Sequence, residues 1–256
     1  MNTPSGPTTW PRTEAEALAV QDALRARVDE TDHSPEPGAP GSLLAGLDVA
    51  YDDDRNVVAA AAVALEAQSL RVVARATALG RVAFPYVPGL LAFREIPALL
   101  DALSALQGQL GRDPDLLVCD GYGRAHPRRF GLASHLGVLT GVPSVGVAKN
   151  PFVFTHGEVG PLRGDSAALV DSSRGTDGAD GADGVDGDGA DEVGRALRTR
   201  EGVKPVFVSA GHRVSLERAC AHTLSLTPRY RLPETTRHAD ALCRQTLREA
   251  YGGRRP

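Results

Sequence analysis

Hydrophobic residues along this chain of 256 residues recur with two periods, which predict both helices and strands. Alanine, leucine and valine at helical spacing over 13–30, behind a threonine N-cap with Glu16 three residues on, predict a first helix. Proline and glycine within 33–41 end it. Three apolar segments joined by polar turns follow and predict an antiparallel meander. They span 43–51, 56–65 and 70–79.

The later pattern alternates longer helical segments with short apolar ones. Helices are expected at 89–110, 128–140, 213–225 and 236–250, and strands at 115–119, 143–147 and 205–209. We therefore expect an α/β protein with a central mixed β-sheet flanked by helices. The domain should span 43–250, behind an N-terminal helix and a Pro/Gly-rich linker over 1–42. Three strands followed by helix, strand, helix and strand is the order of the RNase H-like fold.

Composition places the chain among globular proteins, because 42% apolar residues are enough for one large core. No apolar run reaches the roughly 18 residues that a membrane helix needs, and the first residues lack a basic leader with an apolar core. The three cysteines have wide spacings that suit reduced, buried thiols. We expect a soluble, cytoplasmic protein that does not bind membranes.

The acidic residues are concentrated in one low-complexity segment rich in aspartate and glycine. The formal charge of −4 becomes +3 when residues 171–192, which carry −7, are left out. A mildly basic remainder suits a protein that approaches phosphates. Residues 171–196 are predicted to form a disordered insertion within the domain, and the segment could compete with nucleic acid for the basic surface.

Four other acids stand in apolar or tightly specified surroundings. They are Asp48 in GLDVAY, Glu95 in FREIP, Asp120 in VCDGYG and Asp240 in RHADAL. Each alone fits an ordinary turn, a strand end or a solvated helix face. A carboxylate at the end of an apolar strand is costly to desolvate without a cation, however, and oxygen ligands suit magnesium. Together these acids predict a metal site at one edge of the sheet.

Long motifs around these acids resemble the endonuclease V family of repair nucleases. They are GLDVAY (46–51), FPYVPGLLAFREIP (84–97), VCDGYGRAHPRRFGLASHLGVLTGVPSVGVAKN (118–150), VSAGHRVSLERA (208–219) and YRLPETTRHADALCR (230–244). The resemblance implies an enzyme that recognises deoxyinosine in DNA and hydrolyses the second phosphodiester bond 3′ to it. The products would carry a 3′-hydroxyl and a 5′-phosphate.

By this resemblance, Asp48 and Asp120 are the main magnesium ligands and Glu95 completes the set, with manganese as a substitute. Asp240 is a further catalytic acid, at a position where the family carries either histidine or aspartate. Lys149 resembles the family lysine near the scissile phosphate. Only Lys149 and Lys204 are lysines among 28 basic residues, so a compact point charge stands out at this place.

The same resemblance assigns a substrate-binding surface. Pro85, Tyr86, Val87 and Pro88 match the loop that fills the gap left by the extruded base; a turn with a buried tyrosine is the alternative. The pocket for that base is matched by Gly89, Leu91, Gly121, His126, Gly131 and Leu132. His126 could instead be a loop histidine bonded to the backbone, and Arg128, Arg129 and Arg213 are candidate phosphate contacts.

Two other functions stay open at this point. Some members of the family prefer inosine in RNA, and a contact to the 2′-hydroxyl would decide between the two nucleic acids. A non-catalytic module that binds damaged nucleic acid would need a broken acid set, whereas all four acids are present. The partner is therefore expected to be deoxyinosine-containing DNA or inosine-containing RNA, bound by a monomer.

Overall fold

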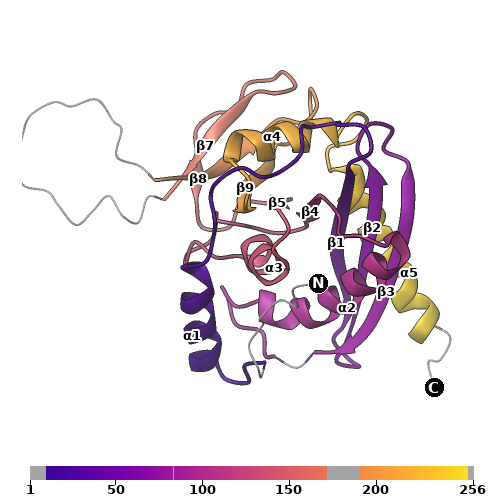
Figure 1. Ribbon diagram of the computed structural model, residues 1–256. Coiled ribbons are helices and arrows are strands. Elements are labelled where there is room, and N and C mark those ends of the chain that lie inside the picture. The colour runs from indigo at the N-terminus through magenta and orange to yellow at the C-terminus, as the bar shows by residue number, and fades with distance from the viewer. Residues whose placement is uncertain (1–9, 83, 172–190, 253–256) are drawn as a thin grey trace, which may run out of the picture.

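The computed structural model describes residues 10–82, 84–171 and 191–252, in which nine strands form one mixed sheet (Figure 1). The strands are β1 (Leu43–Asp52), β2 (Val57–Glu66), β3 (Val72–Arg81), β4 (Leu116–Cys119), β5 (Ser144–Ala148), β6 (Thr155–His156), β7 (Ser166–Val170), β8 (Glu192–Leu197) and β9 (Val206–His212). Their order is β3-β2-β1-β4-β5-β9-β8-β7-β6. β4 runs parallel to β1 and β5, and the other neighbours pair antiparallel. This arrangement confirms the predicted RNase H-like α/β class.

The described residues contain five helices, which are α1 (Glu14–Arg25), α2 (Ala92–Leu110), α3 (Leu132–Thr140), α4 (Leu216–Ser225) and α5 (Glu234–Tyr251). Four of them cover the two faces of this sheet, and α1 packs on α3 (Figure 1). In β4, Leu117 and Cys119 pack toward α1, α2 and α3, whereas Leu116 and Val118 pack toward α4. Both faces of this strand are covered, which is why its sequence is a continuous apolar run.

The predicted helices begin or end at other residues in the structure; the fourth, for example, begins at Leu216 instead of residue 213. The first ends at Arg25 instead of residue 30, although its predicted capping box between Thr13 and Glu16 is present. α2 begins at Ala92 instead of 89 because Gly89 takes a left-handed conformation, with φ 82°. α3 begins at Leu132 instead of 128 because Arg129 is also left-handed, with φ 56°. A left-handed residue interrupts the helical hydrogen bonds.

Residues before the domain take part in its packing through Trp10. Pro97 lies inside α2 and has no N–H to donate to the carbonyl of Phe93, four residues earlier. The indole Nε1 of Trp10 donates to that carbonyl at 2.9 Å, and the Trp10 ring stacks on His135 of α3. The N-terminal region thus satisfies a polar group that the proline leaves free.

The sheet is wider than the sequence predicts, because β6, β7 and β8 were not expected. The end of the predicted disordered insertion, 171–196, is corrected here: Glu192–Leu197 pair with β7 and β9 as β8. Val193, Ala196 and Leu197 are buried in this strand, so apolar side chains outweigh the acidic composition of the residues before it. Residues 172–190 lie outside the described part of the chain.

The cysteines match their prediction. Cys119, Cys220 and Cys243 are buried and form no disulfide. Within the described ranges, no helix has the length and apolar character that a membrane span requires.

Gly46 of β1 should tolerate no side chain, because a Cβ there would lie 2.2 Å from the carbonyl oxygen of Thr235 in α5. We expect Gly46→Ala to lower the free energy of unfolding by about 1–3 kcal/mol or more, measured by urea denaturation. Gly108→Ala is the control, since Gly108 is an exposed glycine inside α2 with open space around its Cβ position. It should stabilise by about 1 kcal/mol. A Gly46→Ala protein as stable as wild type would contradict this packing.

Candidate active site

Two carboxylates meet where β4 ends beside β1. Leu47 lies opposite Cys119 in the parallel register, so the next residues, Asp48 and Asp120, are neighbours. The Asp120 N–H also donates to the carbonyl of Leu47 at 3.2 Å. Residues that are 72 positions apart in the numbering therefore share one edge of the sheet because of strand pairing alone.

The proximity of these acids affects the pKa of Asp48. Burial, followed by the negative charge of Asp120, raises the pKa of Asp48 to about 8. The ammonium group of Lys149, directly after β5, forms an ion pair with the Asp120 carboxylate. Partial burial lowers the pKa of Lys149, but the hydrogen bond to Asp120 and the charges of the acids outweigh it and raise that pKa. Lys149 thus keeps its positive charge beside these carboxylates.

The other two predicted acids approach from the helices. Asp240 of α5 lies 4.0 Å from the Nζ of Lys149 and accepts a hydrogen bond from Arg244 at 3.0 Å. Glu95 of α2 is 8% exposed, and its Oε1 accepts a hydrogen bond from the hydroxyl of Tyr51 at 3.1 Å. Burial raises the pKa of Glu95 to about 7. Burial and the nearby Glu95 raise the pKa of Tyr51, which keeps its hydroxyl a donor.

The donor chemistry of this site fits a hard divalent cation. Asp48, Asp120 and Glu95 offer carboxylate oxygens, and the raised pKa of Asp48 reflects a shortage of positive charge that such an ion would offset. In the described part of the chain, however, no three or more histidine, cysteine, aspartate or glutamate side chains have the arrangement of a complete metal site. The predicted set of three ligands is not gathered around one point. The cation beside Asp120 in this structure is the Lys149 ammonium group.

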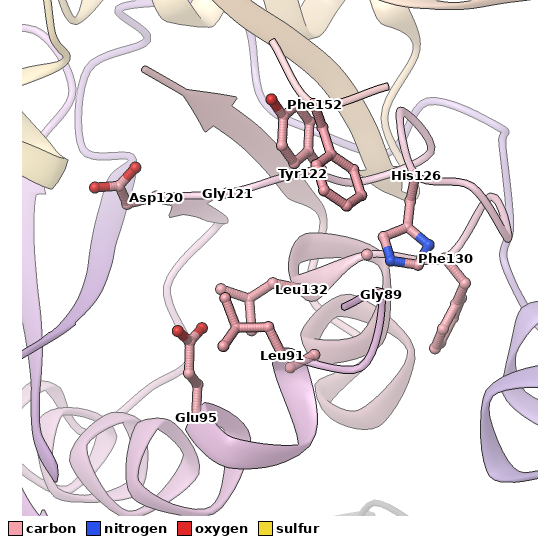
Figure 2. Close-up of a pocket in the computed structure, with 12 residues that line it drawn as sticks. Gly89, Leu91, Glu95, Asp120, Gly121, Tyr122, His126, Phe130, Leu132 and Phe152 are labelled. Atoms are coloured by element: carbon pink, nitrogen blue, oxygen red, sulfur yellow. The ribbon is translucent and has the colours of Figure 1, made fainter. Parts of the chain in front are cut away.

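A cavity of about 170 Å³ adjoins these acids (Figure 2). All six residues predicted for the base pocket line it: Gly89, Leu91, Gly121, His126, Gly131 and Leu132. Glu95 and Asp120 also stand in its wall. The main chain comes close at Gly131, where a Cβ would lie 2.5 Å from the carbonyl oxygen of Tyr122. The structure therefore brings the predicted pocket and two of the predicted catalytic acids together.

His126 joins two segments of the pocket wall. Its Nδ1 accepts from the backbone N–H of Arg128 at 3.2 Å, and its ring also bonds to the main chain of Gly89. Burial lowers the pKa of His126 to about 4, so the ring is neutral and Nε2 carries its proton. His126 is thus bonded to the backbone and also lines the cavity, and its contact with a base stays a prediction.

Three aromatic residues of the cavity were not singled out in the sequence: Tyr122, Phe130 and Phe152. Phe152 is 46% exposed, and its ring centroid lies 6.0 Å from that of Tyr122 and 6.4 Å from that of His126 (Figure 2). Two of them could have been found from local motifs, because Tyr122 lies within DGYG and Phe130 within RRFG. Phe152 carries no such signal, because only the fold places its loop over the cavity.

The candidate wedge loop presents its tyrosine to solvent. Phe84 is 2% exposed and packs on Phe93, while Tyr86 two residues later is 68% exposed. Val87 accepts from the N–H of Leu90 at 2.9 Å across Pro88 and Gly89, and the positive φ of Gly89 makes this a type II turn. The alternative of a buried tyrosine is wrong. Pro85 and Pro88 are exposed on either side of Tyr86.

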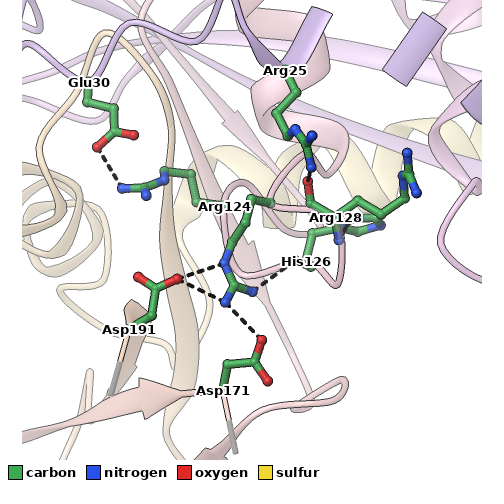
Figure 3. A network of polar contacts seen from close by, with 8 residues as sticks. Arg25, Glu30, Arg124, His126, Arg128, Asp171 and Asp191 are labelled. Carbon is green, nitrogen blue, oxygen red and sulfur yellow. Dashed lines mark hydrogen bonds and ion pairs between the residues drawn. The ribbon is translucent and has the colours of Figure 1, made fainter. Parts of the chain in front are cut away.

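The arginines expected to contact phosphates already have acidic or carbonyl partners, and Figure 3 shows Asp171 and Asp191, the partners of one of them. Arg129 contacts Asp171 at 2.8 Å and Asp191 at 3.0 Å. Arg128 pairs with Asp22 of α1 at 2.5 Å, and Arg213 donates to the carbonyl of Gly141 at 3.1 Å. The contacts of Arg128 and Arg129 attach distant segments to the loop that carries His126. A role in phosphate binding stays a prediction.

Comparisons with known proteins agree with this geometry. A sequence model of the family described as endonuclease V matches residues 22–241. An endonuclease V of Streptomyces coelicolor is 62% identical over 244 residues, which cover 95% of each chain. The crystal structure of an endonuclease V from Streptomyces avermitilis is 61% identical with a TM-score of 0.84, covering 95% of this chain and 97% of that one.

A further neighbour shows the family with nucleic acid. It is endonuclease V of Ciona intestinalis in complex with a DNA that contains an inosine followed by a ribo-adenosine. It is 29% identical with a TM-score of 0.73, covering 92% of this chain and 98% of that one. The chain therefore belongs to the endonuclease V family, whose members are metal-dependent nucleases that hydrolyse phosphodiester bonds in DNA.

Proposed function

We propose that this chain is a DNA repair endonuclease that recognises deoxyinosine and hydrolyses the second phosphodiester bond on its 3′ side. The products carry a 3′-hydroxyl and a 5′-phosphate. The observation that carries the proposal is that Asp120 and Glu95 stand in the wall of the cavity that the base-binding residues line. The inosine-containing DNA bound by the Ciona intestinalis relative supports the same substrate.

Recognition of the base is assigned to the cavity. Hypoxanthine presents a carbonyl at position 6 and an N1–H, where adenine presents an amino group and a bare N1. Main-chain groups of Gly121, Gly131 and Leu132, with Gly89, Leu91 and neutral His126, form the wall that would pair with this edge. Adenine would leave buried polar groups unpaired, which disfavours it. Extrusion of the base costs a few kcal/mol, and less at a mismatch.

The metal assigned to this site is Mg²⁺, with Mn²⁺ as a substitute. Asp48 and Asp120 would hold it, and Glu95 would approach from α2. When bound, the ion supplies Lewis-acid stabilisation to the phosphate undergoing hydrolysis. Lys149 would offset charge that grows on the phosphoryl oxygens, and the position of its ammonium group among the carboxylates supports this role. Asp240 orients that ammonium group from α5.

Tyr86, flanked by Pro85, Val87 and Pro88, would enter the base stack where the nucleotide leaves it. The buried, unpaired thiols suit a reducing compartment, which supports the cytoplasm as the location. We assign the activity to a monomer. Inosine-containing RNA is kept as the alternative substrate and is tested alongside DNA.

The first test is a duplex with one deoxyinosine, labelled at one end, incubated with the protein and Mg²⁺ and sized on a denaturing gel. We expect one nick at the second phosphodiester 3′ to the lesion, no nick with adenosine in its place, and no product in EDTA. Asp120→Asn should lower the rate at least about 100-fold, since the paired carboxylates are assigned to the metal. A matched inosine RNA is the second arm. Equal nicking of the adenosine control would contradict the proposed specificity.

Tyr86→Ala tests the wedge. Stacking on an aromatic ring contributes about 1–3 kcal/mol per base, so the dissociation constant for the deoxyinosine duplex should rise about tenfold. Because Tyr86 is 68% exposed, the urea midpoint should stay that of wild type. Binding is measured by fluorescence anisotropy in EDTA, with an undamaged duplex as control. Unchanged lesion affinity would remove the wedge role.

Asp48→Asn tests the electrostatic strain of the metal-free site. The folded-state pKa of about 8 lies above the unfolded value of about 4, so the stability that goes with the protonated group is lost as pH rises through this window. The variant lacks this titration. In EDTA it should be more stable than wild type by about 1–3 kcal/mol at pH 8.5, and the difference should shrink toward pH 5.

The measurement is urea denaturation at the two pH values, with Asp54→Asn on the exposed β1–β2 turn as control. The control should behave as wild type at both. Mg²⁺ should raise the stability of wild type more than that of Asp48→Asn. A variant that is less stable than wild type at pH 8.5 would show that Asp48 is not held among repelling charges.

A further inference from the structure

Glu95 is held by a single side chain. Among residues 10–82, 84–171 and 191–252, the one side-chain hydrogen bond to its carboxylate comes from the hydroxyl of Tyr51, at 3.1 Å. Glu95 is 8% exposed, so water offers it few other partners. A carboxylate on a helix turns freely about its last torsion unless a donor fixes it. The direction in which Glu95 faces the cavity therefore depends on Tyr51.

The position of Tyr51 on β1 makes this contact possible. Tyr51 lies three residues after Asp48, and side chains alternate between the two faces of a strand. Ala50, on the same face as Asp48, packs toward α5, whereas Tyr51 packs into the cluster that contains α2. One strand thus provides Asp48 on one side and the partner of Glu95 on the other.

The ring of Tyr51 has a second contact, with Arg94. The guanidinium carbon of Arg94 lies 5.1 Å from the ring centroid of Tyr51 and 5.9 Å from that of Tyr86, both within cation–π distance. The Arg94 side chain is 12% exposed, and its ion pair with Asp53 is long, at 3.5 Å, to a carboxylate that is 83% exposed. Its buried Nε has no hydrogen-bond partner. Because the Asp53 carboxylate is largely in solvent, the two tyrosine rings are the more shielded support of this cation.

We propose that Tyr51 is a positioning residue of the nuclease site: its hydroxyl orients the Glu95 carboxylate, and its ring supports Arg94 beneath the wedge residue Tyr86. This inference rests on the proposed function and adds to it a residue outside both the metal acids and the cavity lining. The hydroxyl serves the chemical step and the ring serves lesion binding. The two roles are separable because they belong to different atoms of one side chain.

The test compares Tyr51→Phe with Tyr51→Leu. Tyr51→Phe keeps the ring and removes only the hydroxyl, so the single-turnover nicking rate on the deoxyinosine duplex should fall about tenfold, the effect of one hydrogen bond to a charged group. Its dissociation constant for that duplex, measured in EDTA, should stay within about twofold of wild type. Tyr51→Leu should lose the rate and also weaken binding in EDTA about fivefold, since the support of Arg94 is gone.

Tyr251→Phe is the matched control, because Tyr251 lines the same surface groove as Tyr51 and belongs to neither the acids nor the cavity. It should match wild type in rate and binding. Thermal unfolding of each variant separates positioning from loss of fold: Tyr51→Phe should melt within about 2 °C of wild type. A Tyr51→Phe protein that nicks as fast as wild type would overturn the inference.

Equal losses in nicking rate and EDTA binding by Tyr51→Phe, with a lowered melting point, would also overturn it, because the hydroxyl would then be structural. Failure of wild type to nick the deoxyinosine duplex is a different outcome. It would refute the proposed function itself, whereas a nicking wild type with an unaffected Tyr51→Phe refutes only the role of Tyr51.

Discussion

The parallel pairing of β1 with β4 is the constraint on which the rest of the site depends. It fixes Asp48 beside Asp120 at a partly buried edge, where burial, followed by the negative charge of Asp120, raises the pKa of Asp48. Such a pair is stable only next to positive charge. Lys149, directly after the parallel strand β5, provides part of this positive charge. The carboxylate oxygens of the two acids are also suitable ligands for a divalent cation.

One continuous segment then links recognition to chemistry. Residues 84–95 begin with buried Phe84, expose Tyr86, turn at Gly89 in the cavity wall and enter α2, which carries Glu95. The type II turn therefore follows the exposed Tyr86, which is the proposed wedge, brings the main chain to the cavity and precedes the helix. Pro97 leaves the carbonyl of Phe93 in that helix without its helical donor, and the indole of Trp10 donates to it instead. The N-terminal region therefore also supports this segment.

The sequence predicted those elements that have a regular apolar pattern or lie within a long motif. The meander, β4 and β5 were placed correctly because apolar periodicity is a strong signal, and the motifs around Asp48 and Asp120 pointed to two acids that strand pairing brings together. The start of α3 was missed because nothing in the sequence marks Arg129 as left-handed, whereas Pro88-Gly89 does mark the turn before α2. β8 and the pairing of Arg129 with Asp171 and Asp191 depend on contacts between distant segments, which periodicity does not report. The contact of Tyr51 with Glu95 likewise joins distant segments, so the sequence pattern did not reveal it.

Anomalous diffraction from crystals soaked in Mn²⁺ would show whether Asp48 and Asp120 share one divalent ion. We expect one strong peak within about 2.5 Å of a carboxylate oxygen from each residue, with the Lys149 ammonium group displaced from Asp120. A strong peak at any other place, with no density between these two carboxylates, would contradict it.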